Sequence, residues 1–196
     1  NCQDENSLNN AAQKAEQLLV SDSAKTKNEF NDLSSALDSF SNANIASLSI
    51  PGQFVKDMAV ELIKKQLHLF VFSDHVPLED EIYLKKLALE NNVLFMGPEA
   101  GTTILNGTVF GFGNRVRKGS VGIIGASGTG IQESSTLIDL FGEGISHAIG
   151  VGGRDLRNDI GGMMTMKAME IFENDPNTEA VLLVSKPVND DVRNKI

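Results

Sequence analysis

The stretch VGIIGASGTGIQE, residues 121–133, decides the fold of this chain. Its first four residues are apolar or small, as is typical of a buried parallel strand, and the glycine-rich loop GASGTG follows at once and leads into a helix. Such a turn presents free backbone N–H groups together with the positive end of a helix macrodipole. The stretch matches neither a Gly-Lys-Ser/Thr phosphate loop nor a Gly-x-Gly-x-x-Gly dinucleotide loop. Its spacing therefore leaves two interpretations open, an anion-binding site or a structural turn with an ordinary Ser/Thr cap.

The predicted anion site consists of four consecutive residues, Ser127, Gly128, Thr129 and Gly130. The two hydroxyls add hydrogen-bond donors to those of the backbone amides. The two glycines matter because a Cβ atom would hold a ligand away from the backbone. A phosphate or a carboxylate is the ligand that this arrangement favours.

The composition disfavours several classes of protein. A net charge of −9 over 196 residues disfavours nucleic acid and anionic membrane surfaces as partners. No apolar run reaches the length of a membrane span, and the single cysteine, Cys2, provides neither a disulfide framework nor a cysteine metal site. We therefore expect a cytoplasmic protein without a metal site. Because the chain lacks an initiator methionine, we also expect a fragment of a longer protein.

The chain divides into a polar N-terminal part and two α/β parts. Residues 1–44 carry apolar residues at helical spacing on both sides of the polar stretch SDSAKTKN, which predicts a helical linker or hairpin. After them, short apolar strands alternate with amphipathic helices, which predicts parallel sheets. We expect one partial α/β domain at 45–118 and a second at 119–196, joined by a crossing segment at 97–119. The expected strands are 45–50, 69–72, 93–96, 121–124, 145–151 and 180–184.

Four loops directly follow expected strands. They are the segments 73–75, 97–98, 127–129 and 152–155. In an open parallel sheet, ligands bind beyond the carboxyl ends of the strands. We therefore expect these loops to supply the functional site.

Six motifs give the chain a resemblance to a known family. In order along the chain they are SIPGQFVKDMAVELI, FSDHVPLEDE, LFMGPEAGT, VGIIGASGTGIQE, GISHAIGVGGRDL and NDPNTEAVLLVSKP. They cover residues 45–187 in unbroken order and resemble the α subunit of succinyl-CoA synthetase (succinate–CoA ligase). The GISHAIGVGGRDL and ASGTGIQE segments are more similar to the FdrA proteins, an acyl-CoA synthetase-like branch of that family.

The resemblance implies two Rossmann-like or flavodoxin-like parallel-sheet domains. A partial CoA-binding domain at 45–118 would be followed by a partial succinyl-CoA synthetase-like domain at 119–196, with coenzyme A and phosphate as ligands. CoA contacts would fall on Pro51, Ser73, Asp74, His75, Gly97 and Pro98, and phosphate or an acyl phosphate would lie at 127–130. Substrate contacts would fall on Gln132, Glu133, Gly152, Gly153 and Arg154. Gln132 stands where the family has a substrate-binding tyrosine.

Two roles are open for Arg154, one of the expected substrate contacts. It can be a second phosphate ligand. It can also pair with Asp155 or Asp159 on the surface, which is the commoner outcome for such a residue.

Two departures from the family concern catalysis. Nothing in residues 1–44 matches the family's glycine-rich first loop, and the chain contains no Gly-His-Ala-Gly segment for a phosphohistidine. His147 lies inside an expected strand, where a hydrogen-bonded core histidine is the favoured interpretation, and His75 is a better contact than a nucleophile. No catalytic residue is therefore assigned.

Three functions follow from the resemblance. The first is an acyl-CoA synthetase-like ligase subunit with a β-type partner subunit, through which an ATP- or GDP-type nucleotide would act. The second is an FdrA-type subunit of an oxamate carbamoyltransferase system in allantoin degradation, with a carbamoyltransferase partner. The third is a non-catalytic regulatory subunit. The oligomeric state, including a homo-oligomer, stays open.

Overall fold

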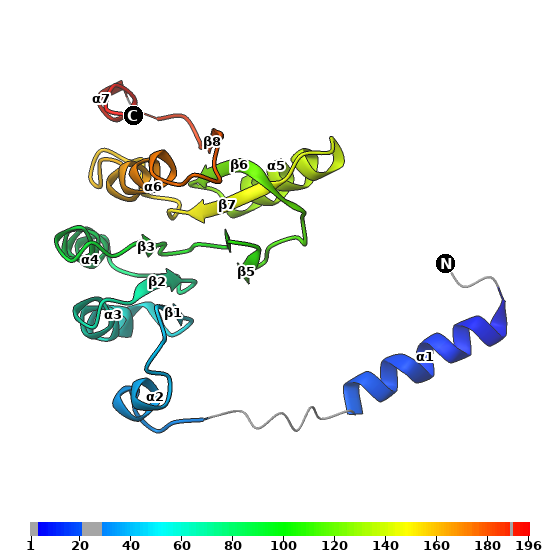
Figure 1. Cartoon of the computed structure of the whole chain (residues 1–196). Coiled ribbons are helices and arrows are strands. Elements are labelled where there is room, and N and C mark those ends of the chain that lie inside the picture. The colour runs from blue at the N-terminus through cyan, green and yellow to red at the C-terminus, as the bar shows by residue number, and fades with distance from the viewer. Residues whose placement is uncertain (1–3, 21–28, 189) are drawn as a thin grey trace. The chain divides into compact units, whose positions relative to one another are not determined.

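The computed structural model describes residues 4–20, 29–188 and 190–196. The chain divides into two compact units, Asn1–Asn42 and Ala43–Ile196 (Figure 1). Among the described residues, no helix is both long enough and apolar enough to cross a membrane. The same residues contain no group of three His, Cys, Asp or Glu side chains placed to hold a metal ion.

The first unit contains the two helices that the sequence predicts, α1 (Glu5–Val20) and α2 (Leu33–Ser39). Asp32 caps the second helix, because its Oδ1 accepts a hydrogen bond from the Ser35 N–H at 2.8 Å. The polar stretch SDSAKTKN lies outside the described residues. The assignment of 1–44 as a linker or hairpin stays a prediction.

The second unit begins with a three-stranded parallel sheet in the order β1-β2-β3. Its strands are β1 (Ile45–Leu48), β2 (His68–Val71) and β3 (Phe95–Met96), which confirms the first three expected strands; the first and third are shorter than expected, and the second is shifted by one residue. The connections contain the 3-10 turn η1 (Gly52–Phe54) and the helices α3 (Val55–Lys64) and α4 (Leu78–Glu90). Each crossover therefore carries the chain back to the end of the sheet at which the preceding strand began, as parallel pairing requires.

A five-stranded mixed sheet follows in the order β5-β4-β7-β6-β8. Its strands are β4 (Thr102–Leu105), β5 (Thr108–Gly111), β6 (Lys118–Gly125), β7 (Ile145–Gly150) and β8 (Ala180–Val184). Strand β6 runs parallel to both β7 and β8, which confirms the three expected strands of this part. Strand β4 runs antiparallel to β5 and to β7, so this sheet is not wholly parallel.

The antiparallel hairpin of β4 and β5 corrects the expectation of a crossing segment at 97–119. Its two turn residues, Asn106 and Gly107, have φ values of 48° and 81°, the backbone conformation of a tight hairpin turn. The hairpin pairs with β7 through Ile104 and Ala148. The second sheet therefore draws on residues from both sides of Gly119. An Asn-Gly pair between short apolar runs is a recognised hairpin signal, so Asn106 and Gly107 mark this turn in the sequence as well.

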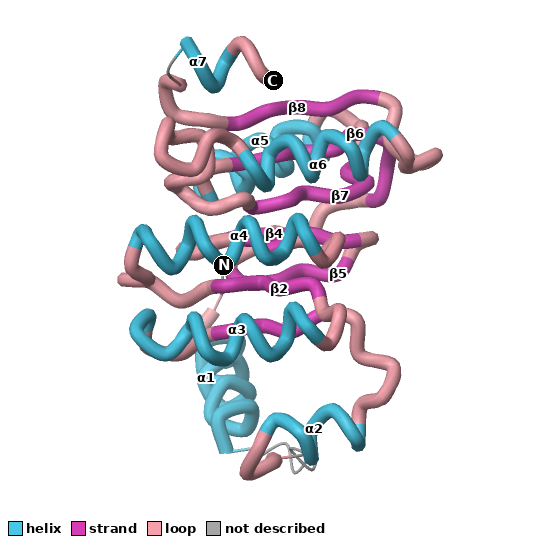
Figure 2. The backbone as a smooth tube through the Cα atoms, turned by 90° about the vertical axis from the view of Figure 1, so that its left-hand side faces the viewer, coloured by secondary structure: helices cyan, strands magenta, loops and turns pink. Residues whose placement is uncertain are grey.

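Helices cover the sheets in layers. Helices α3, α4 and α6 (Met163–Glu173) lie on one side, and α5 (Gly128–Leu140) lies on the opposite face of the second sheet (Figures 1 and 2). The short helix α7 (Asp190–Arg193) follows the last strand. A buried cluster joins α5 to the second sheet. It consists of Ile131 of α5 and of four sheet residues, Ile104, Ile123, Ile145 and Ala148. This packing holds the loop between β6 and α5 at the carboxyl end of β6.

Candidate functional site

The loops at the carboxyl ends of the strands lie in close contact, as the sequence predicts for an open sheet. Gly52 packs so tightly against the backbone of Asp74 and His75 that a Cβ atom would overlap them. A Cβ atom on Gly152 would lie 2.7 Å from the carbonyl carbon of Gly97. Glycine at these two positions therefore lets loops from different strands meet.

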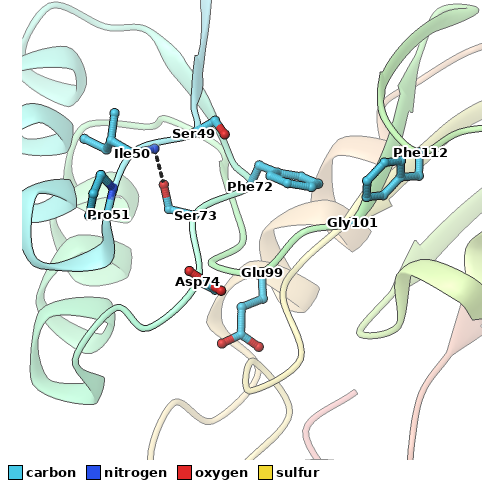
Figure 3. A pocket seen from close by; sticks show the side chains of 9 residues that line it. All are labelled: Ser49, Ile50, Pro51, Phe72, Ser73, Asp74, Glu99, Gly101 and Phe112. Atoms are coloured by element: carbon cyan, nitrogen blue, oxygen red, sulfur yellow. Dashed lines mark hydrogen bonds between the residues drawn. The ribbon is translucent and has the colours of Figure 1, made fainter.

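A groove opens where these loops meet, and it has a volume of about 630 Å³ (Figure 3). Its lining consists of Ser49, Ile50, Pro51, Phe72, Ser73, Asp74, Glu99, Gly101 and Phe112. The hydroxyl of Ser73 accepts a hydrogen bond from the Ile50 N–H at 2.9 Å and donates to Leu48 O at 3.4 Å. Ser73 thus ties the ends of β1 and β2 together and forms part of the groove floor.

The groove has aromatic walls and no cation. Phe72 and Phe112 face one another edge to face, with ring centroids 5.3 Å apart (Figure 3). The ionisable groups among the nine lining residues are the carboxyls of Asp74 and Glu99. The groove therefore favours apolar and uncharged polar groups, and it disfavours phosphate groups.

A second, smaller pocket of about 50 Å³ adjoins the groove. It is lined by Glu99, Ala100, Gly101, Thr102, Gly125, Ala126, Ser127, Gly128, Gly150, Gly152 and Gly153. Glu99 and Gly101 line both cavities, so the two spaces are neighbours. At roughly 10–15 Å³ for each water molecule, the small pocket has room for about three to five waters. This size suits a small anion and excludes a molecule as large as CoA.

The amino end of α5 forms one wall of the small pocket. Ser127 caps the helix, because its Oγ accepts a hydrogen bond from the Gly130 N–H at 3.2 Å. Within the described part of the chain, no protein atom accepts a hydrogen bond from the N–H of Gly128 or Thr129. The interpretation as an ordinary Ser cap is therefore confirmed, whereas anion binding at 127–130 stays a prediction; of these four residues, Ser127 and Gly128 line the small pocket.

The structure brings some of the predicted CoA contacts together and leaves others aside. Pro51, Ser73 and Asp74 line the groove. The side chain of His75 is 89% exposed, and its Nδ1 lies 3.1 Å from Asp74 Oδ2 outside the groove lining. Gly97 and Pro98 are buried behind Gly152 and line neither cavity.

Only some of the predicted substrate contacts line a cavity. Gly152 and Gly153 line the small pocket, whereas Glu133 is exposed and lines neither cavity. Gln132 donates through Nε2 to Thr102 Oγ1 at 2.9 Å, so it supports a wall of the small pocket from behind. Its amide is therefore engaged by the protein.

Of the nine groove residues, the sequence analysis predicted Pro51, Ser73 and Asp74, and it missed six: Ser49, Ile50, Phe72, Glu99, Gly101 and Phe112. Glu99 and Gly101 follow an expected strand directly, so the rule for carboxyl ends could have included them. Phe112 reaches the groove from the end of β5. That strand was not predicted, because residues 97–119 were expected to form a crossing segment.

Four charged residues of α4 and the loop after β7 form a cluster, which we call the charge cluster: Glu81, Lys85, Arg154 and Asp155. Lys85 Nζ lies 2.9 Å from Glu81 Oε1 and 2.8 Å from Asp155 Oδ1, and these three side chains have no exposed area. Arg154 Nε lies 2.7 Å from Glu81 Oε2. Both contacts of Glu81 are close ion pairs without hydrogen-bond geometry. The expected pairing of Arg154 with Asp155 or Asp159 is wrong, because α4 supplies Glu81 from a distant part of the sequence.

His147 lies in β7 and is hydrogen-bonded, as the sequence predicts, but its side chain is 26% exposed and is therefore not fully part of the core. Its Nδ1 accepts a hydrogen bond from the Asn106 N–H at 3.0 Å, and its Nε2 lies 3.5 Å from Asp175 Oδ2. A hydrogen bond from Thr178 is the main cause that lowers the pKa of Asp175. His147 lines neither the groove nor the small pocket.

A comparison with known protein families matches one domain family to the part of the chain that forms most of the second sheet. Residues 116–195 match the family model of the CoA binding domain. This range contains β6, α5, β7, α6 and β8, and therefore much of the small pocket. The assignment of a CoA-binding-like domain to 45–118 stays a prediction.

Relatives with similar sequences are longer than this chain. The uncharacterized protein YahF of Escherichia coli (strain K12) is 43% identical over 190 residues, which cover 92% of this chain and 37% of YahF. The succinate–CoA ligase [ADP-forming] subunit alpha of Aquifex aeolicus (strain VF5) is 28% identical over 169 residues, which cover 80% of this chain and 52% of that subunit. The chain is thus homologous to succinate–CoA ligase α subunits and related CoA ligases, and it spans about half the length of those it matches. Membership in the FdrA branch stays a prediction.

A solved structure supports the fold. ATP citrate lyase from Methanothrix soehngenii, in complex with citrate and coenzyme A, superposes with a TM-score of 0.69 at 16% identity. The match covers 79% of this chain and 26% of the lyase chain. Together with the parallel strands of both sheets, it confirms the expected α/β class.

Proposed function

We propose that this chain is part of an acyl-CoA ligase subunit of the succinate–CoA ligase α type. The groove would receive the arm of CoA, and the small pocket would hold phosphate or the phosphate of an acyl phosphate. The observation that carries the proposal is the junction of the two cavities at Glu99 and Gly101. A thiol in the groove and an acyl phosphate in the pocket would meet at that junction.

The small pocket suits an anion on three grounds. The N–H of Gly128, which lines the pocket, has no acceptor within the described part of the chain and can donate to an anionic oxygen. The 13 residues of α5 place the positive end of their macrodipole at this point. Gly101 and Gly128 leave the backbone bare, since a Cβ atom on Gly128 would lie 3.2 Å from Gly101 Cα. This donor and the helix dipole are fixed before a ligand arrives, which favours stabilisation of developing negative charge.

The groove suits one part of CoA and not another. Its volume of about 630 Å³ lies within the range of small-molecule sites, and its aromatic walls fit an apolar arm. The carboxyls of Asp74 and Glu99 repel phosphate groups, so the phosphates of CoA do not fit among the nine lining residues. When bound, CoA supplies a thiol that accepts an acyl group. The role of this chain would be to orient that thiol and to shield it from water.

A partner subunit belongs to this proposal. Relatives of this chain are named as alpha subunits of ADP-forming ligases, so a β-type subunit would supply the nucleotide site. The chain contains no Gly-His-Ala-Gly segment, and the proposed function assigns no phosphohistidine to it. A regulatory subunit without chemistry of its own is the alternative that the same fold allows.

Calorimetry on the full-length protein tests the proposal with CoA and with inorganic phosphate as separate ligands. We expect both to bind. Phe112→Ala removes one wall of the groove and should weaken CoA binding about tenfold, roughly the 1.4 kcal/mol of one aromatic contact. Phe141→Ala is the matched control, because Phe141 is 84% exposed at the end of α5 and lines neither cavity.

Two results would separate the alternatives. If wild-type protein binds neither ligand, the ligase proposal fails. If it binds both and yields no acyl-CoA with its partner subunit and nucleotide, the regulatory function is favoured. The FdrA-type carbamoyltransferase stays a prediction, and formation of carbamoyl phosphate from oxamate and phosphate would support it.

A further inference from the structure

Arg154 lies between the loops that line the two cavities. It directly follows Gly152 and Gly153, which line the small pocket, but it lines neither cavity itself. Its Nη2 donates to Val76 O at 2.7 Å. Val76 belongs to the loop 72–77 between β2 and α4, the same loop that carries three residues of the groove lining. One side chain therefore joins the loop of the small pocket to the loop of the groove.

The charge cluster fixes both sides of this connection to α4. Arg154 Nε contacts Glu81 Oε2 at 2.7 Å, while Lys85 Nζ donates to Val151 O at 3.0 Å on the other side of the glycine turn. The Val151 N–H in turn donates to Gly125 O at 2.9 Å, which joins the turn to the loop before α5. The glycine turn is thus held from both ends by Arg154 and Lys85, neither of which lines a cavity.

We propose that Arg154 is a positioning residue that holds the groove loop and the small-pocket loop in one arrangement, so that its loss weakens binding in both cavities. This inference rests on the proposed function for the identity of the two ligands. It differs from the role of a second phosphate ligand, because a direct ligand would affect phosphate alone. The guanidinium suits this role, since its Nε reaches Glu81 while its Nη2 reaches Val76.

Hydrogen exchange on the full-length protein tests the connection without any ligand. Arg154→Met should raise amide exchange in two segments, 72–77 and 150–155. Protected amides exist in both, because the Ser73 N–H donates to Leu48 O at 3.3 Å and the Val151 N–H donates to Gly125 O. Arg157→Met is the matched control in the same loop, because Arg157 is exposed and should leave both segments unchanged.

Arg154→Lys covers the case in which the methionine variant fails to fold. The lysine keeps a cation beside Glu81 but has one nitrogen in place of the two that reach Glu81 and Val76 separately, so the contact with Val76 should weaken and segment 72–77 should loosen while the protein stays folded. Faster exchange confined to 150–155, or none at all, would overturn the proposal.

Binding measurements add the functional readout. We expect Arg154→Met and Arg154→Lys to weaken the binding of both inorganic phosphate and CoA, within the roughly 5-fold to 150-fold range of coupled sites. A loss of phosphate binding alone would identify Arg154 as a direct ligand and would contradict the positioning role. If wild-type protein binds neither ligand, the ligase proposal fails, and the exchange result still decides whether Arg154 joins the two loops.

Discussion

Lys85 Nζ lies 2.8 Å from Asp155 Oδ1, and neither side chain has any exposed area. The two residues are 70 positions apart, and they join α4 of the first sheet to the start of α6 beside the second. Asp155 also accepts hydrogen bonds from the backbone N–H groups of Met164 and Thr165 at 3.2 and 2.9 Å. A single buried carboxylate therefore binds the first turn of α6 and receives the cation that holds the glycine turn of the small pocket.

Loss of this cation should strongly destabilise the fold. Lys85→Met leaves the carboxylate of Asp155 buried without a counter-charge, and breaking a buried pair in this way costs about 3–5 kcal/mol. Chemical denaturation should show this fall in the free energy of unfolding. Lys86→Met is the control, because Lys86 is exposed on the same helix and should change stability little. Equal stability of the two variants would contradict a structural role for the charge cluster.

The cap of α5 can be separated from anion binding. Ser127→Ala should cost about 1 kcal/mol, since the Gly130 N–H loses its acceptor. Ser127→Asn and Ser127→Asp both keep a capping oxygen and should keep stability near that of the wild type. Only the aspartate adds a negative charge at the small pocket, so it should weaken phosphate binding about tenfold or more. Similar phosphate affinities for the asparagine and aspartate variants would argue against an anion in this pocket.

The contact between Gly152 and the loop after β3 should be essential to the small pocket. Gly152 and Gly142 have φ values of 89° and 96°, so alanine at either position costs roughly 1–2 kcal/mol of backbone strain. Nothing lies within 4 Å of a Cβ atom at Gly142, whereas a Cβ atom at Gly152 would lie 2.7 Å from Gly97 and Pro98. Gly152→Ala should therefore lose more stability than Gly142→Ala, and it alone should weaken phosphate binding. Denaturation and calorimetry on the two variants provide the comparison.

His68 should make stability depend on pH. Partial desolvation of its ring, with a smaller effect of the Lys167 charge, holds the pKa of His68 below its ordinary value of 6.5. Because the folded-state pKa is lower than the unfolded one, the unfolded chain binds the proton more readily. The stability that neutral His68 contributes is therefore fully present above its pKa in the unfolded chain. It is lost as the pH falls toward its pKa in the folded protein.

The variant His68→Asn isolates this effect. The His68 ring accepts a hydrogen bond from the Leu94 N–H at 3.0 Å through Nδ1, and an asparagine oxygen can replace that acceptor without titrating. The free energy of unfolding, measured from about pH 8 to about pH 5, should fall less for the variant than for the wild type. Parallel curves would show that His68 does not contribute.

Local pattern was enough to predict most of the fold. The strands containing Ile123, Ala148 and Leu182 are short apolar runs between turn residues, and the glycine-rich loop before α5 follows one of them directly. The hairpin at Asn106 was not predicted because residues 97–119 were assigned to one crossing segment despite the Asn-Gly turn, and the pairing of β4 with β7 joins strands far apart in the chain. Phe112 was missed as a groove residue for the same reason.

By itself, the sequence determined the α/β class and the loops that can bind a ligand, because strand period, helix period and glycine placement are local properties of the chain. The tertiary structure alone decided which loops meet and which polar groups stay free. It assigned Ser127 to the helix cap and Arg154 to Glu81, and it buried Lys85 beside Asp155. These outcomes depend on contacts between segments tens of residues apart, and no local pattern encodes the distances at which those segments come together.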